Sequence, residues 1–205
     1  MKIREIQLQT HNLKALKKFY SETLELPIVV EREYWFSVKA GASKITFRQT
    51  RSQEKPFYHF AFNIPENQLK EAKTWLSSRL TLIKKDGKDE FHFAEWNADA
   101  VYFLDPVDNI VELIARHNLK NTSQKPFSSS SLLCVSEIGY PAEDVRLFSR
   151  AIKDELNLKL WKGDEKTFAA VGDEEGLFII VPIGRPWFPL DTPAEDFPLG
   201  VDPAE

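Results

Sequence analysis

The sequence has little cysteine, no long apolar run and no excess of basic residues. Cys134 is the only cysteine among 205 residues, which rules out an internal disulfide and nearly rules out a cysteine-based zinc site. No stretch of about 18 apolar residues occurs, so the sequence predicts no membrane-spanning helix. The charged N-terminus, residues 1–5, does not fit a secretory signal, and we expect a cytoplasmic protein.

The composition also narrows the class of protein. The formal net charge of −4 gives no electrostatic attraction to nucleic acid, because binding phosphates requires a basic surface. Hydrophobic residues make up 42% and charged residues 28%, the balance of a soluble globular protein. A chain of 205 residues is expected to form one large or two small domains.

A pattern of one strand, one helix and three strands occurs three times along the chain. In the first copy, residues 3–10 alternate as a strand does, and Asn12 is placed to cap a helix that begins near Leu13. Pro27 ends this helix, and three short strands follow. The predicted organisation comprises paired modules at 1–52 and 56–117 that form the first cup over 1–117, a Ser-rich linker at 118–131, a third module at 132–186 and a Pro-rich tail at 187–205. We expect the tail to lie against the surface or to be disordered.

Local motifs within these modules resemble the vicinal-oxygen-chelate superfamily, which includes glyoxalases, bleomycin-resistance proteins and extradiol dioxygenases. Three segments carry the resemblance: Ile6-x-Leu8-x-Thr10-x-Asn12-Leu13-x-x-Leu16-x-x-Phe19-Tyr20, Tyr58-His59-Phe60-Ala61-Phe62 and Tyr102-Phe103-x-Asp105-Pro106-x-x-Asn109-x-x-Glu112-Leu113. The third module matches more loosely, through Glu137-Ile138-Gly139. The resemblance implies an α+β fold in which βαβββ modules pair into an open barrel, with a third module besides.

In such a module one sheet face packs on the helix and the other lines a cup. The alternation of each strand assigns these faces. The residues predicted to face the cup are Glu5, Gln7, His59, Ala61, Glu112 and Ile114. The alternate residues, among them Ile6, Phe60 and Leu113, are predicted to face the helices.

The resemblance also implies a metal site. The family's ligand positions fall on Glu5, Thr46, His59 and Glu112 in this sequence. Glu5 stands where histidine is usual, and Thr46 where a carboxylate often occurs. We therefore expect Glu5, His59 and Glu112 to bind a divalent metal ion (Fe, Mn, Zn or Ni), with Glu5 and Glu112 also acting in catalysis. Alternatively, Glu5 and His59 form a hydrogen-bonded pair, and Glu112 pairs with Arg48 or Arg116.

Aromatic and polar residues complete the predicted site. Trp35, Trp96 and Tyr102 would stack on an aromatic or apolar ligand, and ordinary core packing is the alternative role. The predicted substrate-binding residues are Gln7, Trp35, Arg48, Trp96 and Tyr102. The expected function is that of a metal-dependent lyase, isomerase or extradiol-type dioxygenase acting on a small oxygenated or aromatic substrate. The alternatives are a metal-free drug- or metabolite-binding protein and an interaction module with filled cups.

The odd number of modules raises the question of quaternary structure. If the first two modules pair, the third is left with an unpaired sheet edge and a bare concave face. We therefore expect a two-fold homodimer through the third modules. A monomer in which the third module folds onto the first cup is the alternative.

Overall fold

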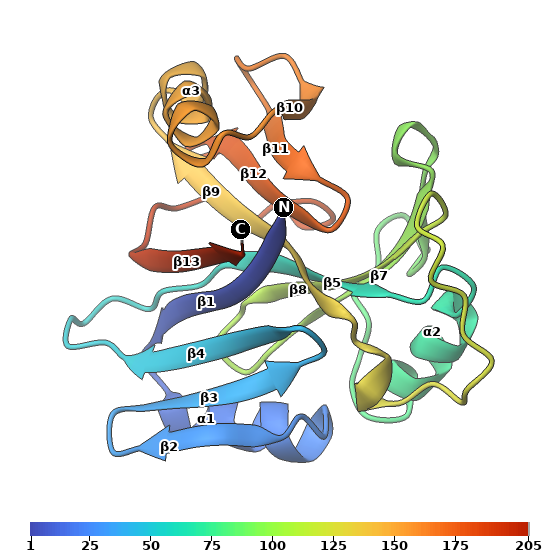
Figure 1. The fold of residues 1–205 in the computed structure, drawn as a ribbon. Helices are drawn as coiled ribbons and strands as arrows, with labels where there is room; N and C mark the ends of the chain where they lie inside the picture. The colour runs from blue at the N-terminus through green and yellow to red at the C-terminus, as the bar shows by residue number, and fades with distance from the viewer. Residues whose placement is uncertain (205) are drawn as a thin grey trace.

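The computed structural model describes residues 1–204, and its strands form two curved sheets (Figure 1). The five-stranded sheet has the order β13-β1-β4-β3-β2, and the eight-stranded sheet has the order β10-β11-β12-β9-β5-β8-β7-β6. The predicted α+β architecture of repeated βαβββ modules, with a third module, is confirmed.

The first module follows the expected order of elements. It consists of β1 (Lys2–Thr10), α1 (Leu13–Lys18) with the π-helical turn η1 (Phe19–Thr23), β2 (Ile28–Arg32), β3 (Trp35–Ala40) and β4 (Ser43–Gln49). The side chain of Asn12 accepts a hydrogen bond from the Ala15 backbone N–H at 3.1 Å, so the predicted cap is confirmed.

The second and third modules repeat this order. The second has β5 (His59–Ile64), α2 (Leu69–Ser77), β6 (Phe91–Phe93), the 3-10 turn η2 (Ala94–Trp96), β7 (Ala98–Leu104) and β8 (Ile110–Arg116). After the 3-10 turn η3 (Ser129–Ser131), the third has β9 (Cys134–Ala142), α3 (Val145–Leu156), β10 (Leu160–Gly163), β11 (Ala169–Asp173) and β12 (Gly176–Pro182). In each module the first strand pairs in parallel with the last.

The pairing of modules differs from the sequence prediction. Strand β5 pairs antiparallel with β9, which joins the second and third modules in the eight-stranded sheet. The prediction that the first and second modules share a cup is therefore wrong. Every residue of β5 is buried, and the sequence could not identify its neighbour, since β1 and β9 carry the same apolar alternation on their helix-facing side.

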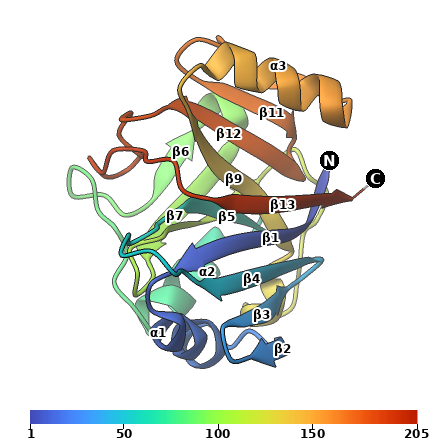
Figure 2. The same ribbon diagram turned by 90° about the vertical axis from the view of Figure 1, so that its left-hand side faces the viewer.

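The C-terminal tail also differs from expectation. It contains strand β13 (Leu199–Ala204), which pairs antiparallel with β1, so that both ends of the described chain lie side by side (Figure 2). Proline residues obscured this strand in the sequence, but Pro203 lies on an edge strand, where a missing N–H is tolerated.

The two faces of the sheets bury separate cores. Residues on the helix-facing side, such as Ile6, Phe60 and Ile138, belong to one large cluster. Residues on the concave side of the eight-stranded sheet, such as Ala61, Ile114 and Ile179, form a second cluster. The second cluster therefore lies on the concave face of the eight-stranded sheet, where the second and third modules form a shared cup.

The pairing of β9 with β5 bears on the expected homodimer. The third module has a partner within the chain, so an unpaired third module no longer argues for a dimer. The homodimer itself stays a prediction. Within residues 1–204, no helix combines the length and the apolar character needed to cross a membrane.

Candidate metal centre

Three buried side chains with metal-binding atoms meet inside the cup of the second and third modules. They are His59 at the start of β5, Glu112 on β8 and Glu137 on β9, and their nearest nitrogen and oxygen atoms all lie within 4.8 Å of one another. Their exposed fractions are 6%, 3% and 4%. One imidazole and two carboxylates are a donor set that suits Mn²⁺, Fe²⁺ or Zn²⁺.

The hydrogen bonding of His59 prepares it to act as a ligand. Its Nδ1 lies 3.1 Å from the backbone carbonyl oxygen of Ile110. Because a carbonyl oxygen can only accept, Nδ1 is protonated and donates the hydrogen bond. The lone pair of the neutral ring then sits on Nε2, which lies 3.7 Å from Oε2 of Glu112. Burial lowers the pKa of His59 to about 4, which keeps the ring neutral at physiological pH.

The two carboxylates are costly to ionise in this position. Burial, followed by the charge of Glu137, raises the pKa of Glu112 well above its usual range. Burial also raises the pKa of Glu137, against the opposing effect of Arg116. Two adjacent buried carboxylates become stable as anions only when a cation lies between or beside them. The pair therefore favours binding of a positive ion.

Arg116 supplies one such cation from the end of β8. Its side chain is fully buried and donates from a terminal nitrogen to Oε1 of Glu137, and its Nε donates to the Asn63 side-chain oxygen at 3.1 Å. The guanidinium carbon lies 5.5 Å from the ring centroid of Trp96 and 5.7 Å from that of Trp161. Glu137 thus has one oxygen paired with Arg116, and its other oxygen remains for a metal ion.

A cavity of about 370 Å³ opens onto the three ligands. Its volume lies in the range of small-molecule sites. Aromatic and aliphatic side chains make up most of its wall. The aromatic side chains of this wall include Phe93, Trp96, Tyr102, Phe168, Trp187 and Phe188. The Trp187 ring lies 5.1 Å from the His59 ring, so the segment after β12 covers the ligands.

The structure separates the predicted site residues into two groups. His59, Glu112, Trp96 and Tyr102 line this one cavity. Burial, and then the charge of Glu112, raises the pKa of the Tyr102 hydroxyl well above its usual range, which keeps that hydroxyl protonated.

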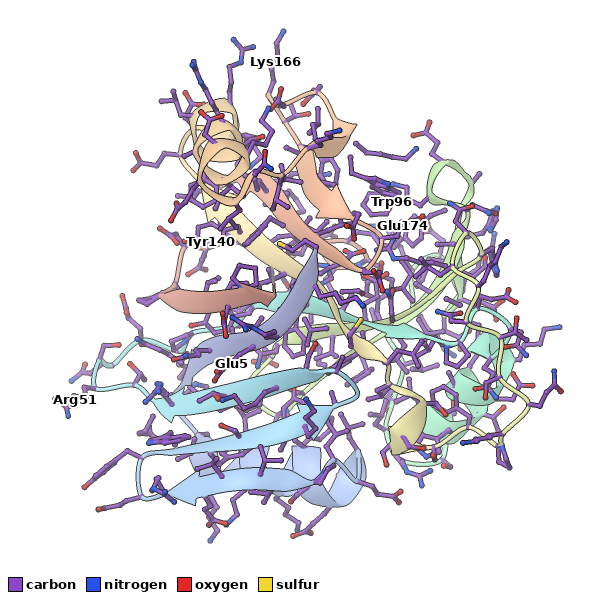
Figure 3. All side chains as sticks on the ribbon, in the orientation of Figure 1. Glu5, Arg51, Trp96, Tyr140, Lys166 and Glu174 are labelled. Carbon is purple, nitrogen blue, oxygen red and sulfur yellow. The ribbon has the colours of Figure 1, made fainter. Side chains whose placement is uncertain are left out.

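Glu5, Gln7, Trp35 and Arg48 lie instead on the five-stranded sheet, and Figure 3 shows Glu5 and Trp96 in different parts of the molecule. The prediction that Glu5 joins His59 and Glu112 in one site is therefore wrong. The reason is again that the second module pairs with the third module and not with the first.

Glu5 has other partners. Its carboxylate accepts a hydrogen bond from the Thr46 hydroxyl at 2.5 Å and pairs with Lys44 at 2.9 Å. The neighbouring guanidinium of Arg48 lies 5.0 Å from the Trp35 ring centroid and donates from Nε to the Gln7 side-chain oxygen at 3.3 Å. The alternative pairs, Glu5 with His59 and Glu112 with Arg48 or Arg116, do not form either. Glu112 lies beside His59, and Arg116 pairs with Glu137.

Strand register explains why Glu137 belongs to the site. His59 pairs with Ile110, and Glu112 lies two residues further along β8. Glu137 pairs with Leu177, and Ile179 lies two residues further along β12. Glu137 therefore holds the position of His59 in the next module, and Ile179 holds that of Glu112. In the sequence, Glu137 stands out only as part of the motif Glu137-Ile138-Gly139, without an assigned role. An alignment of the three repeats places it level with Glu5 and His59.

The sequence of the chain is similar to that of one curated protein, a glyoxalase. No protein-family model matches the chain. The sequence is 28% identical over 99 residues to "Glyoxalase 1" of Caenorhabditis elegans, a match that covers 42% of this chain and 35% of the worm protein. The chain thus spans about a third of the curated relative.

Two solved structures resemble the whole fold. A Bacillus subtilis protein named "putative dioxygenase" superposes with a TM-score of 0.60 at 18% identity, over 90% of this chain and 65% of that one. A mutant of glyoxalase I from Zea mays gives a TM-score of 0.58 at 14% identity, over 87% of this chain and 66% of that one. The chain therefore has the glyoxalase/dioxygenase fold, as its motifs predicted.

Proposed function

We propose that the cup of the second and third modules binds a divalent metal ion and acts as a metal-dependent enzyme on a small oxygenated or aromatic substrate. The observation that carries this proposal is the buried set of His59, Glu112 and Glu137 at the base of a cavity of about 370 Å³. The names of the relatives, a glyoxalase and a dioxygenase, support the same class of chemistry.

Each group would have a definite part in such a reaction. His59, Glu112 and Glu137 would hold the ion, which would supply Lewis-acid stabilisation of negative charge on a substrate oxygen. Glu112 lines the cavity beside His59, where it would be placed to accept a proton from the substrate. The protonated Tyr102 hydroxyl is placed to donate a hydrogen bond in the same cavity.

A second candidate function is metal-free binding of a drug or metabolite. The ion pair of Arg116 with Glu137 favours it, because the guanidinium already balances one of the two buried carboxylates. The aromatic wall of the cavity would then hold the ligand by stacking.

Metal content separates the two functions. Protein purified without chelator or affinity nickel is analysed for bound metal, beside His59→Ala and Glu5→Gln. We expect about one Mn, Fe, Ni or Zn per chain in the wild type and in Glu5→Gln. The metal should be lost in His59→Ala, because of these two residues only His59 lies in the cup. Removing one ligand of this kind is expected to weaken metal binding at least about tenfold.

The Glu5→Gln variant is the matched control, since the sequence predicted Glu5 as a metal ligand together with His59 and Glu112. Metal lost from both variants would place the ion elsewhere. If wild-type protein binds no metal, even after soaking with each ion, the metal-free function replaces the enzyme. Fluorescence titration with aromatic ligands would then be the next assay.

A further inference from the structure

The cavity of the proposed metal centre has a second charged residue, Arg185, at its mouth. Arg185 follows β12 and lines the cavity together with His59, Glu112 and Glu137. It is exposed to solvent. Across residues 1–204, its side chain makes no hydrogen bond or ion pair with another residue, whereas Arg116 below it is paired.

The backbone around Arg185 is held in place. Its N–H donates to the Pro182 carbonyl oxygen at 3.1 Å, and its own carbonyl accepts from Ala194 at 2.8 Å. A further hydrogen bond, from the Trp187 N–H to the Thr192 carbonyl oxygen at 2.9 Å, closes this hairpin. The guanidinium carbon of Arg185 lies 5.2 Å from the Phe168 ring centroid. A fixed backbone and an aromatic neighbour orient the cation at little entropic cost when a ligand binds.

The nearby acid, Asp164, forms no ion pair with Arg185. Partial burial of its side chain lowers the pKa of Arg185, and the charge of Asp164 opposes this effect from a distance too long for an ion pair. Both oxygens of Asp164 are already used within its own loop. Oδ1 accepts from the backbone N–H groups of residues 166, 167 and 168 at 2.8, 2.8 and 3.2 Å, and Oδ2 accepts from the Thr167 hydroxyl at 2.9 Å. The guanidinium therefore remains available to a ligand.

Charge in the cavity points to the same kind of ligand. With a divalent ion bound and both carboxylates ionised, the charges of Glu112, Glu137, Arg116 and the ion would sum to one positive charge in the buried site. Arg185 adds a second positive charge at the mouth. A neutral ligand would leave both uncompensated in a largely apolar cavity, which is electrostatically unfavourable.

We propose that Arg185 recognises the carboxylate of the ligand, so that the cavity selects small aromatic or apolar carboxylic acids over their neutral counterparts. The apolar body would lie against Trp96, Phe168 and Phe188, and the carboxylate would form a charge-assisted hydrogen bond with the guanidinium. This inference rests on the proposed use of the cavity as a ligand site, and it names the class of ligand.

The test uses benzoate, phenylacetate, mandelate and phenylpyruvate, each beside its uncharged amide, with full-length protein in the presence and absence of Mn²⁺. Binding is followed by tryptophan fluorescence, because Trp96 and Trp187 line the cavity. At least one acid is expected to bind about tenfold more tightly than its amide. Arg185→Gln should remove that preference, and Arg185→Lys should restore part of it.

Arg150→Gln is the matched control, because Arg150 is an exposed arginine on α3 that does not line the cavity. Failure of all four acids to bind below about 10 mM, about 2.7 kcal/mol by the usual conversion, would overturn the inference, as would equal binding of acid and amide or an unchanged preference in Arg185→Gln. Metal content of Arg185→Gln is measured in parallel. Loss of acid selectivity with normal metal content supports the inference, and absence of metal from wild-type protein counts against the proposed enzyme alone.

Discussion

The concave face of the first module and the cup of the second and third modules are built from the same repeat, yet they differ in chemistry. At equivalent register positions the first module carries Glu5 and Thr46, and the second carries His59 and Glu112. Glu5 is paired with Lys44 on its own sheet, and its side chain keeps 14% of its exposure. In the cup, the neighbouring strand instead brings a second carboxylate, Glu137, to the buried pair.

The neighbouring strand accounts for much of this difference. Beside β5 lies β9, which contributes Glu137 and Gly139 to the cup, whereas beside β1 lies β13, which contributes Gly200 opposite Gln7. The second module thus provides two of the three candidate ligands, and the third module provides one. Five substitutions would sharpen or break this comparison.

The largest effect is expected from Arg116→Met. It removes the partner of Glu137 and leaves a carboxylate unpaired in a site where Arg116 was fully buried. We expect a loss of about 3–5 kcal/mol in the free energy of unfolding, measured by urea denaturation. Added Mn²⁺ should recover part of this loss, because the ion would take the place of the guanidinium.

Arg48→Met is the corresponding change on the face of the first module. Arg48 is exposed beside Trp35, so a loss of no more than about 1 kcal/mol is expected, without any response to Mn²⁺. Similar losses in the two variants would contradict the view that the cup alone holds a buried charge network.

An intermediate effect is expected from alanine at two glycines. A Cβ on Gly139 would come within 2.6 Å of the Trp187 ring, whereas a Cβ on Gly200 would meet nothing closer than 3.5 Å. Gly139→Ala should therefore lower the free energy of unfolding by about 1–3 kcal/mol through overpacking.

Gly200→Ala should change the free energy of unfolding by less than about 0.5 kcal/mol. Chemical denaturation followed by tryptophan fluorescence compares the two variants directly. Equal stability would show that Trp187 does not pack tightly over β9.

The smallest effect concerns the outer edge of the second module, where histidine is exposed and not buried as in the cup. The hydrogen bond with Asp99, at 2.8 Å, is the main factor that raises the pKa of His117 above its usual value. Protonated His117 therefore stabilises the fold fully below pH about 6.5, and this contribution is lost as pH rises through the higher folded-state pKa.

Asp99→Asn should lower the pKa of His117 towards its ordinary value, as measured by NMR titration of the ring protons. The stability gained below pH about 6.5 should shrink in the same variant. An unchanged titration would mean that Glu66, whose carboxylate lies 3.3 Å from the other ring nitrogen, is sufficient.

Much of the candidate site could be predicted from single strands. The alternation around His59 and Glu112 correctly placed both side chains in a cup, and Trp96 and Tyr102 were correctly placed beside them. Glu137 could not be assigned from its own strand, because its alternation fits a polar cup whichever module lies beside it. Arg116, at the end of β8, gave no sequence signal of its burial, since arginine is rarely enclosed without a partner.

The sequence by itself determined the repeated module, the helix cap at Asn12 and the face of each strand on which a side chain lies, because these depend on neighbours a few residues apart. Only the tertiary structure decided that β5 lies beside β9 and that β13 lies beside β1. The alternation of a strand is the same whichever strand pairs with it, so the choice depends on long-range packing of both faces. That choice removed Glu5 from the candidate site and brought in Glu137.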